Sequence, residues 1–326
     1  MKPWRQAGGG RLNRAISTFV LLLCACPLAD GSQGVPISAS LGPRSPAVQG
    51  TRTVRVTVVT DKGAAVPDLT PADFEVKEDG KTREVLTAER STEPWSVALL
   101  LDDKGSDINE IRSALAAFVL RLRGRAEVSL VSVVPTTMKV FDYTSSTPTM
   151  MAGIQRLVWR AGPAGGLVLG AVADAADEHK RREVGRPAIV VITFEGTEFR
   201  SHKPANTILA ALERSHAALH VVAVGKPTFR RMNPAPTEGV QGDEWTVDEQ
   251  NRNAVLGEGP RQSGGRRHEL AVATGLTKAL EAVADDLLNQ YALVYAGATD
   301  PKPSRKLSVS VKRRGVIVRA PTKIAG

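Results

Sequence analysis

The chain has 326 residues and a mass of 34.7 kDa, with 42% hydrophobic and 24% charged residues. These values are typical of a medium globular domain plus a small one, and they exclude wholesale disorder, collagen and a polytopic membrane protein. The formal net charge is +9, but Lys2, Arg5, Arg11 and Arg14 supply four of these charges within the first 29 residues, which contain no acid. The rest is a modest surface charge, so we expect no nucleic-acid partner.

Residues 1–29 have the three-part pattern of a secretory signal peptide. A basic stretch leads into an apolar run over residues 15–25, which is too short to span a bilayer, and small residues follow. We therefore expect an exported chain, periplasmic or secreted, without a transmembrane segment in its mature form. Both cysteines lie in this segment, so a cleaved protein has none. The alternative is an outer-membrane lipoprotein anchored at Cys26, although Pro27 weakens that interpretation.

Residues 30–50 are rich in glycine, proline and serine and are interpreted as a flexible tether. The following segment, 51–92, shows two runs of alternating apolar and polar residues and a strong Asp79-Gly80 hairpin signal. This pattern predicts a small antiparallel β domain. Two further alternating runs near the C-terminus flank a turn at Arg313-Arg314-Gly315 and predict a second hairpin. We expect residues 303–320 to complete the small β domain.

Residues 93–296 alternate between strand and helix patterns, which predicts an α/β domain with a doubly wound, mostly parallel sheet. Residues 96–101 form an unbroken apolar run, as expected of a strand buried on both faces. The next apolar residues, from Ile108 to Leu122, follow helical spacing. Further strands are predicted at 127–134, 187–194, 219–224 and 291–295, and further helices near 150–158, 167–180, 204–216 and 277–290.

Residues 226–267 interrupt this rhythm with four prolines, six glycines and no sustained apolar period. We interpret them as a partly disordered insertion, with a lid or partner-binding loop as the alternative. Residues 297–326 are predicted to hold the C-terminal strands and a tail.

The first central strand ends in Asp102, and Lys104 and Ser106 follow it. Ligands of doubly wound sheets bind beyond the carboxyl ends of the strands, where the strand order reverses. At this point the chain resembles the von Willebrand factor type A fold, whose first strand ends in Asp-x-Ser-x-Ser, the opening of a metal-ion-dependent adhesion site.

The wider resemblance, over about residues 52–320, is to the bacterial exported VWFA-related Acidobacterial domain family. It rests on several weak motifs that occur in order and at the expected spacing. These are Val58 to Gly63, Leu69 to Val76 with Glu78-Asp79-Gly80, Leu99 to Asp102, Gly165-Gly166-Leu167, Leu270 to Gly275, Leu287 to Tyr291, and the basic strand around Val309 to Arg319.

The resemblance implies a hard cation such as Mg²⁺ or Mn²⁺, held by a carboxylate, hydroxyls and waters. This sequence keeps Asp102 and Ser106 but has Lys104 in place of the first serine, Leu167 in place of a threonine, and Phe194 in place of an aspartate. An ammonium about 4 Å from a divalent ion would repel it by roughly 8 kcal/mol at an effective dielectric near 20. We therefore expect a degenerate site without metal or other cofactor.

Two alternative interpretations place a functional site at this edge of the sheet. Glu195 can replace the missing aspartate if the strand end shifts by one residue, which gives a cation-dependent adhesion site from Asp102, Ser106 and Glu195; such a shift would reverse the side chain's face. A distant third is a phosphohydrolase with Asp102 as nucleophile and Lys104 as electrostatic support, but it lacks a second aspartate and a general base.

Other candidate residues carry weaker signals. His216 and His220 are four residues apart, but His220 is predicted to begin a strand, so we do not expect a shared metal. Lys312-Arg313-Arg314 is interpreted as a solvated turn, with an anionic surface partner as the alternative. Without a constellation of nucleophile and base, we expect no enzyme. The expected function is an exported, metal-independent module that binds a protein or cell-surface partner.

Overall fold

The computed structural model describes residues 50–102, 108–133, 136–158, 167–194, 203–225 and 242–325, with side chains described from residue 247 onward in the last range. The predicted signal peptide, Cys26 and all of the predicted tether except Gly50 lie outside these ranges. None of the helices in the described parts of the chain combines the length and apolar character needed to cross a bilayer.

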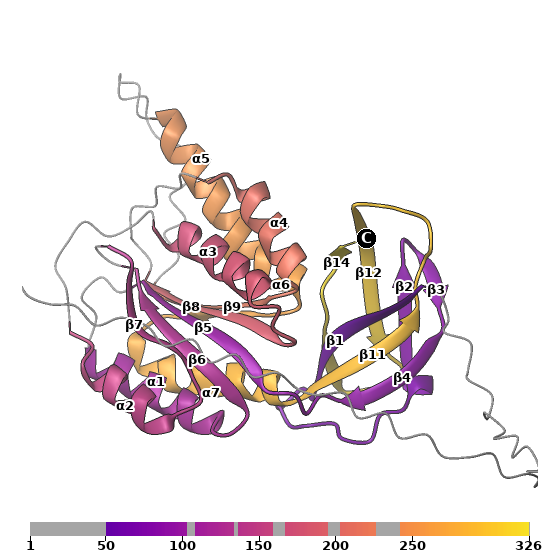
Figure 1. The fold of residues 1–326 in the computed structure, drawn as a ribbon, viewed down its shortest axis with the longest axis horizontal. Coiled ribbons are helices and arrows are strands. Elements are labelled where there is room, and N and C mark those ends of the chain that lie inside the picture. The colour runs from indigo at the N-terminus through magenta and orange to yellow at the C-terminus, as the bar shows by residue number, and fades with distance from the viewer. Residues whose placement is uncertain are drawn as a thin grey trace, which may run out of the picture. The chain divides into compact units, whose positions relative to one another are not determined.

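A six-stranded, mostly parallel sheet has the order β10-β9-β8-β5-β6-β7 (Figure 1). Its strands are β5 (Trp95–Asp102), β6 (Ala126–Ser132), β7 (Met138–Thr144), β8 (Pro187–Phe194), β9 (Ala218–Val224) and β10 (Arg267–Leu270). Only the edge strand β7 pairs antiparallel among these six. Every residue of β5 and β8 is buried, as an unbroken apolar run requires. The predicted doubly wound α/β fold is confirmed.

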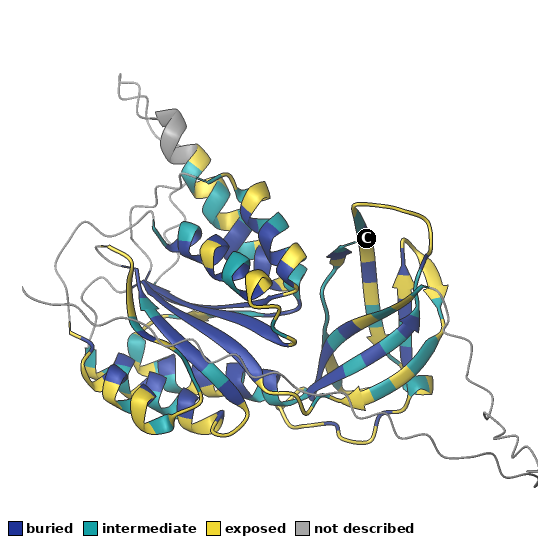
Figure 2. Cartoon of the chain, in the orientation of Figure 1, coloured by how far each residue is buried: buried dark blue, intermediate teal, exposed yellow. Residues whose placement is uncertain are grey.

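Helices cover both faces of this sheet, and Figure 2 shows the buried strands between them. One face packs against α1 (Ile108–Arg121), α2 (Thr147–Gln155) and α7 (Leu276–Leu288). The other packs against α3 (Leu167–Arg181), α4 (Ala205–Ser215) and the short π-helical segment η2 (Asn253–Glu258). The predicted apolar stripe of α1 is confirmed, because Ile111, Leu115 and Phe118 are all fully buried.

Residues 242–270 differ from the expected loop. They form α5 (Gly242–Arg252), η2, α6 (Gly259–Ser263) and the edge strand β10. Val255 and Leu256 are fully buried against the sheet face that α3 and α4 also cover. This apolar pair, together with the buried Gly259 and Pro260, anchors a segment whose helices otherwise carry mostly polar residues. The remainder of the predicted insertion, residues 226–241, lies outside the described residues.

The N- and C-terminal parts of the described chain form two four-stranded sheets that share an apolar core. One sheet has the order β13-β1-β11-β4, and the other has the order β14-β12-β2-β3. Their strands are β1 (Thr51–Thr60), β2 (Phe74–Glu78), β3 (Lys81–Arg83), β4 (Val85–Arg90), β11 (Gln290–Ala296), β12 (Ser304–Val311), β13 (Val316–Arg319) and β14 (Lys323–Ala325). The described residues also form two short 3-10 turns, η1 (Pro71–Asp73) and η3 (Ala273–Gly275). We call this β-rich region the sandwich.

The first predicted hairpin is present, and the second is wrong. β2 and β3 pair across Asp79 and Gly80, whose φ values of 51° and 81° suit the tight turn that an Asp-Gly pair forms. By contrast β12 pairs with β2 and β14, while β13 pairs with β1. The turn after Val311 therefore carries the chain from one sheet to the other, because each strand finds its partner in the N-terminal segment.

Strand β11 also differs from expectation, because it belongs to the sandwich and not to the central sheet. Helix α7 thus leads directly from one region into the other. At this junction the Thr57 hydroxyl donates to the Asp286 carbonyl oxygen at 3.2 Å, and Arg319 of β13 pairs with the Asp286 carboxylate at 2.9 Å. Arg266 lies 3.4 Å from the other carboxylate oxygen.

Candidate functional site

The strand order of the central sheet reverses between β5 and β8, so the carboxyl ends of these strands define the candidate site. The register pairs Asp102, the last residue of β5, with Thr193, the next to last of β8. Phe194 ends β8, and Leu167 begins α3. The structure therefore brings Asp102 and Phe194 to the same edge, as the sequence predicts.

Asp102 is held by the strand beside it. Its carboxylate is buried and accepts a hydrogen bond of 2.8 Å from the Thr193 hydroxyl. A buried carboxylate needs such donors, since removal from water is otherwise costly. Sequence reasoning missed Thr193, because it looks like one more β-branched residue of a buried strand. The β-branched side chain and its hydroxyl serve two purposes here: sheet packing and fixing the orientation of Asp102.

The other described positions of the site are apolar and packed. Phe194 is 7% exposed and belongs to the core cluster beneath α1 and α7. Leu167 is half-buried and packs against the opposite cluster, with α3. Neither side chain offers an oxygen to a cation. The first turn of α3 therefore contributes packing at the position where the resemblance implies a hydroxyl.

Among the described residues, this edge offers a cation few oxygen ligands. They are the buried Asp102 carboxylate and the Thr193 hydroxyl, which donates to that carboxylate, so most ligands of a hard cation would have to be waters or residues outside the described ranges. Within the described ranges, no three His, Cys, Asp or Glu side chains form a group able to hold a metal. Lys104, Ser106 and Glu195, and with them the rebuilt site and the phosphohydrolase arrangement, lie outside the described residues.

Exposed apolar side chains lie at the same edge of the sheet. Met138 begins β7 opposite Ser132, and its antiparallel direction puts that residue at the carboxyl edge. Val158 follows α2, the helix that returns to this edge, and Val272 follows β10. Their exposed fractions are 45%, 64% and 61%, which makes them exceptions among the large apolar residues. Sequence reasoning missed all three.

His216 and His220, the two histidines of the sequence prediction, and a third histidine, His179, lie in different surroundings. His220 is buried inside β9, where burial first and then the nearby charges of His268, Arg319 and Arg266 lower its pKa to about 3. His216 caps α4 with a left-handed φ of 55°. His179 is buried near the end of α3, and burial followed by the Arg182 charge lowers its pKa to about 4. The Tyr143 hydroxyl and His179 Nε2 lie 3.0 Å apart.

The basic turn after β12 is partly occupied by the protein itself. Lys312 donates to the Ala72 carbonyl oxygen at 2.8 Å, and Arg313 pairs with Asp68 at 2.7 Å. The turn therefore ties β12 to the segment that precedes β2. Two of the three cations of the turn, Lys312 and Arg313, are thus engaged within the protein, which weakens the alternative that this turn binds an anionic surface partner.

Searches of family profiles and of curated protein sequences find no match to the chain. Solved structures with a similar arrangement include an aerotolerance-related membrane protein from Bacteroides fragilis, which is 15% identical, covers 59% of this chain and 98% of its own, and has a TM-score of 0.40. BatB from Bacteroides thetaiotaomicron is 14% identical, with 60% and 97% coverage and a TM-score of 0.39. Proximal thread matrix protein 1 from the mussel byssus, with a zinc-occupied MIDAS motif, is 12% identical, with 63% and 48% coverage and a TM-score of 0.42.

The fold assignment rests on the chain's own topology. The order β7-β6-β5-β8-β9-β10 is the doubly wound order 3-2-1-4-5-6, with its first edge strand reversed. This arrangement fits the von Willebrand factor A-like fold that the sequence predicts. The central domain is therefore a doubly wound α/β domain of the kind that the resemblance to von Willebrand factor A-like proteins predicts.

Proposed function

We propose that this protein is an exported, non-catalytic interaction module that binds a protein or cell-surface partner at the carboxyl edge of its central sheet, without a metal ion. The observation that carries the proposal is the chemistry of that edge. Asp102 is buried and bound to Thr193, while Phe194 and Leu167 occupy positions where a cation would need oxygen ligands.

Exposed apolar side chains support a direct protein contact. Met138, Val158 and Val272 lie exposed at the edge where von Willebrand A-like domains carry their site. Burial of such side chains against a partner contributes about 25 cal/mol per Å² of apolar surface removed from water. Affinity of this kind needs no metal bridge. Export is supported by the signal-peptide pattern of residues 1–29 and is tested by sequencing the N-terminus of the protein recovered outside the cytoplasm.

Metal independence is tested by calorimetric titration of the protein with Mg²⁺ and Mn²⁺, with thermal unfolding in parallel. A bound ion at a hundred times its Kd would stabilise the fold by about 2.7 kcal/mol, so a functional site produces a clear shift. We expect no heat of binding and no shift for the wild type. Binding that Asp102→Asn or Glu195→Gln abolishes would instead establish the cation-dependent adhesion site. Lys104→Ser tests whether the ammonium is what excludes the ion.

The location of the partner surface is tested by photo-crosslinking in cells. A photoreactive phenylalanine analogue at Val158 or Val272 should give the same covalent adduct, because both positions lie at the carboxyl edge. Leu120, exposed at the opposite end of the sheet near the end of α1, is the matched control and should give none. Adducts of equal yield at Leu120, or none at the two valines, would contradict this location.

A further inference from the structure

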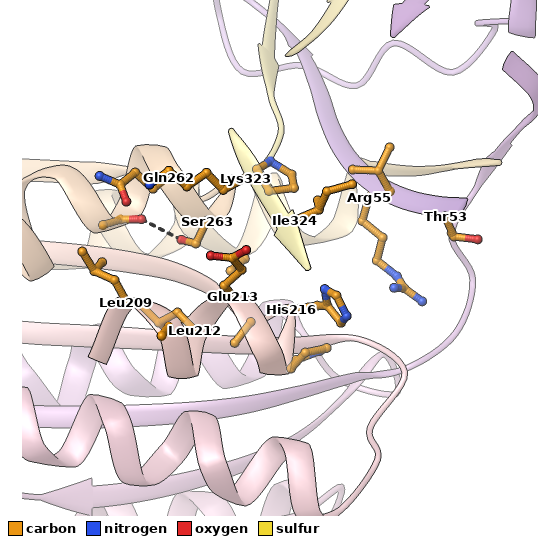
Figure 3. A pocket seen from close by; sticks show the side chains of 18 of the residues that line it. Thr53, Arg55, Leu209, Leu212, Glu213, His216, Gln262, Ser263, Lys323 and Ile324 are labelled. Atoms are coloured by element: carbon orange, nitrogen blue, oxygen red, sulfur yellow. Dashed lines mark hydrogen bonds between the residues drawn. The ribbon is translucent and has the colours of Figure 1, made fainter. Parts of the chain in front are cut away.

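A second feature with ligand-binding character lies away from the carboxyl edge. A cavity of about 300 Å³ opens between α4 and α6 on one side and β1 and β14 on the other (Figure 3). This volume is at the lower end of the range for small-molecule sites, which form preferentially where two structural regions meet. It suits a ligand of about ten non-hydrogen atoms, given that a water molecule takes up about 30 Å³.

Hydrogen bonds fix the α6 wall of this cavity. The Ser263 hydroxyl donates to the Gly259 carbonyl oxygen at 2.9 Å and accepts from the Leu219 amide at 2.9 Å. The Thr322 amide, just before β14, donates to the Gln262 carbonyl oxygen at 2.9 Å. Helix α6 is thus tied both to β9 and to the strand on the far side of the opening. These hydrogen bonds therefore hold the α6 wall of the cavity in place.

The α4 wall presents a carboxylate. Glu213 comes from the last turn of α4, and Figure 3 shows its carboxylate facing the space beneath Ser263 and Ile324. Its Oε1 atom is buried and accepts no hydrogen bond from any described residue. A buried carboxylate oxygen without a donor is unfavourable, so this position calls for an N–H group from a ligand.

The β1 wall presents the complementary group. Arg55 donates through one terminal nitrogen to Glu93 at 3.3 Å, but its Nε atom is buried and has no acceptor among the described residues. Lys323 of β14 adds a second, exposed positive charge to the lining. This side of the cavity therefore calls for an anionic oxygen, and a carboxylate matches the planar guanidinium best.

His216 lies between the two charges in Figure 3. Burial, followed by the positive charges of Lys180 and Arg55, lowers the pKa of His216, and Glu213 acts in the opposite direction. Both charges are thus close enough to act on one imidazole. An imidazole in its neutral form offers one donor and one acceptor.

The rest of the lining is largely apolar. Leu209 and Leu212 project from α4, and Ile324 faces them from β14. A ligand that uses both charged walls can therefore also place a hydrocarbon group against these side chains. An α-amino acid with an apolar side chain carries these three groups, an ammonium, a carboxylate and a hydrocarbon group, on one small molecule.

We propose that this cavity binds a free α-amino acid with an apolar side chain, its ammonium group on Glu213 and its carboxylate toward Arg55. The apolar side chain lies against Leu209, Leu212 and Ile324. The site is separate from the carboxyl edge of the central sheet and does not depend on the function proposed there.

The test begins with thermal unfolding of the full-length protein in millimolar concentrations of each standard L-amino acid, followed by calorimetry with those that raise the Tm. We expect apolar amino acids such as leucine to raise it. The analogues 3-methylbutylamine, which lacks the carboxylate, and 4-methylpentanoate, which lacks the ammonium, should bind at least about tenfold more weakly, because each loses one charge-assisted contact.

Glu213→Gln and Arg55→Gln should each weaken leucine binding by about ten- to a hundredfold. Glu249→Gln, an exposed carboxylate on α5, is the matched control and should leave binding unchanged. If Glu213→Gln lowers the Tm of the free protein, the two leucine analogues on the wild type still decide the matter. No shift with any amino acid, retained binding in both variants, or equal binding of either analogue would overturn the proposal.

Discussion

The two middle strands of the central sheet and the core of the sandwich bury different chemistry. β5 and β8 of the central domain are continuous runs of buried, mainly apolar residues. The sandwich instead encloses Glu78, whose side chain is 0% exposed, and Arg305, whose side chain is 1% exposed. Arg52 and Arg83 also contact Glu78, at 3.4 Å and 3.2 Å.

This difference matches how the two regions are assembled along the chain. Most strand neighbours in the central domain are also close in the chain: β5, β6 and β7 follow one another, as do β8 and β9, although β5 also pairs with β8. The sandwich must bring β12 from the C-terminal part of the chain beside β2, more than two hundred residues earlier. Glu78 accepts from the Ala298 amide at 2.6 Å and lies 3.7 Å from Arg305. The buried charges therefore sit where distant segments must recognise one another.

The largest effect is expected for Glu78→Gln. The variant leaves Arg305 and its neighbours without their central carboxylate, and breaking one partner of a buried ion pair typically costs about 3–5 kcal/mol. Urea unfolding measures the loss of unfolding free energy. Glu75→Gln, an exposed neighbour on the same strand, is the control and should change stability little. A loss below about 1 kcal/mol for Glu78→Gln would show that the cluster does not stabilise the sandwich.

The corresponding change in the central domain is Leu99→Ala in β5. Leu99 is fully buried, so the substitution leaves a cavity and should cost about 3 kcal/mol. Hydrogen exchange separates the two variants: Leu99→Ala should raise exchange in β5, β6 and β8, and Glu78→Gln in β1, β2 and β12. Identical exchange patterns would mean that the two regions open as one cooperative unit.

The sequence predicts the central domain better than the sandwich for the same reason. The apolar runs of β5 and β8 and the helical spacing of α1 are local signals, and both are confirmed. The pairing of β12 and β13 is not local: a turn at Arg313-Arg314-Gly315 shows that the chain reverses, not which strand each arm joins. The predicted hairpin is wrong because β13 pairs with β1.

The candidate site was predictable only in part. A doubly wound order places the end of β5 at the reversal point, so Asp102 and Phe194 follow from the topology. Thr193 could not be found in this way, because a buried threonine in a strand usually signals packing alone. The cavity beside Glu213 and Arg55 could not be predicted from the sequence either. Its walls come from β1, α4, α6 and β14, and no local pattern shows that these four elements meet.

A smaller effect on stability is expected from His220, a titratable residue buried in the central domain, as the pH falls. His220 is 2% exposed in β9, and its folded pKa of about 3 lies below the ordinary value of 6.5. The folded state therefore binds fewer protons than the unfolded chain. The stability that depends on neutral His220 is complete above about pH 6.5 and decreases by about 1.4 kcal/mol per pH unit as the pH falls toward the folded pKa.

His220→Gln should remove this contribution, because glutamine does not titrate. Unfolding free energies measured from pH 7 downward should decrease less steeply for the variant than for the wild type. The two slopes should differ by about 1.4 kcal/mol per pH unit, which is the value for one proton. Glu249→Gln, which is exposed on α5, should keep the wild-type slope. Equal slopes for His220→Gln and the wild type would mean that water or a rearranged Arg266, His268 or Arg319 accommodates the imidazolium. The surroundings of β9 would then tolerate a buried positive charge.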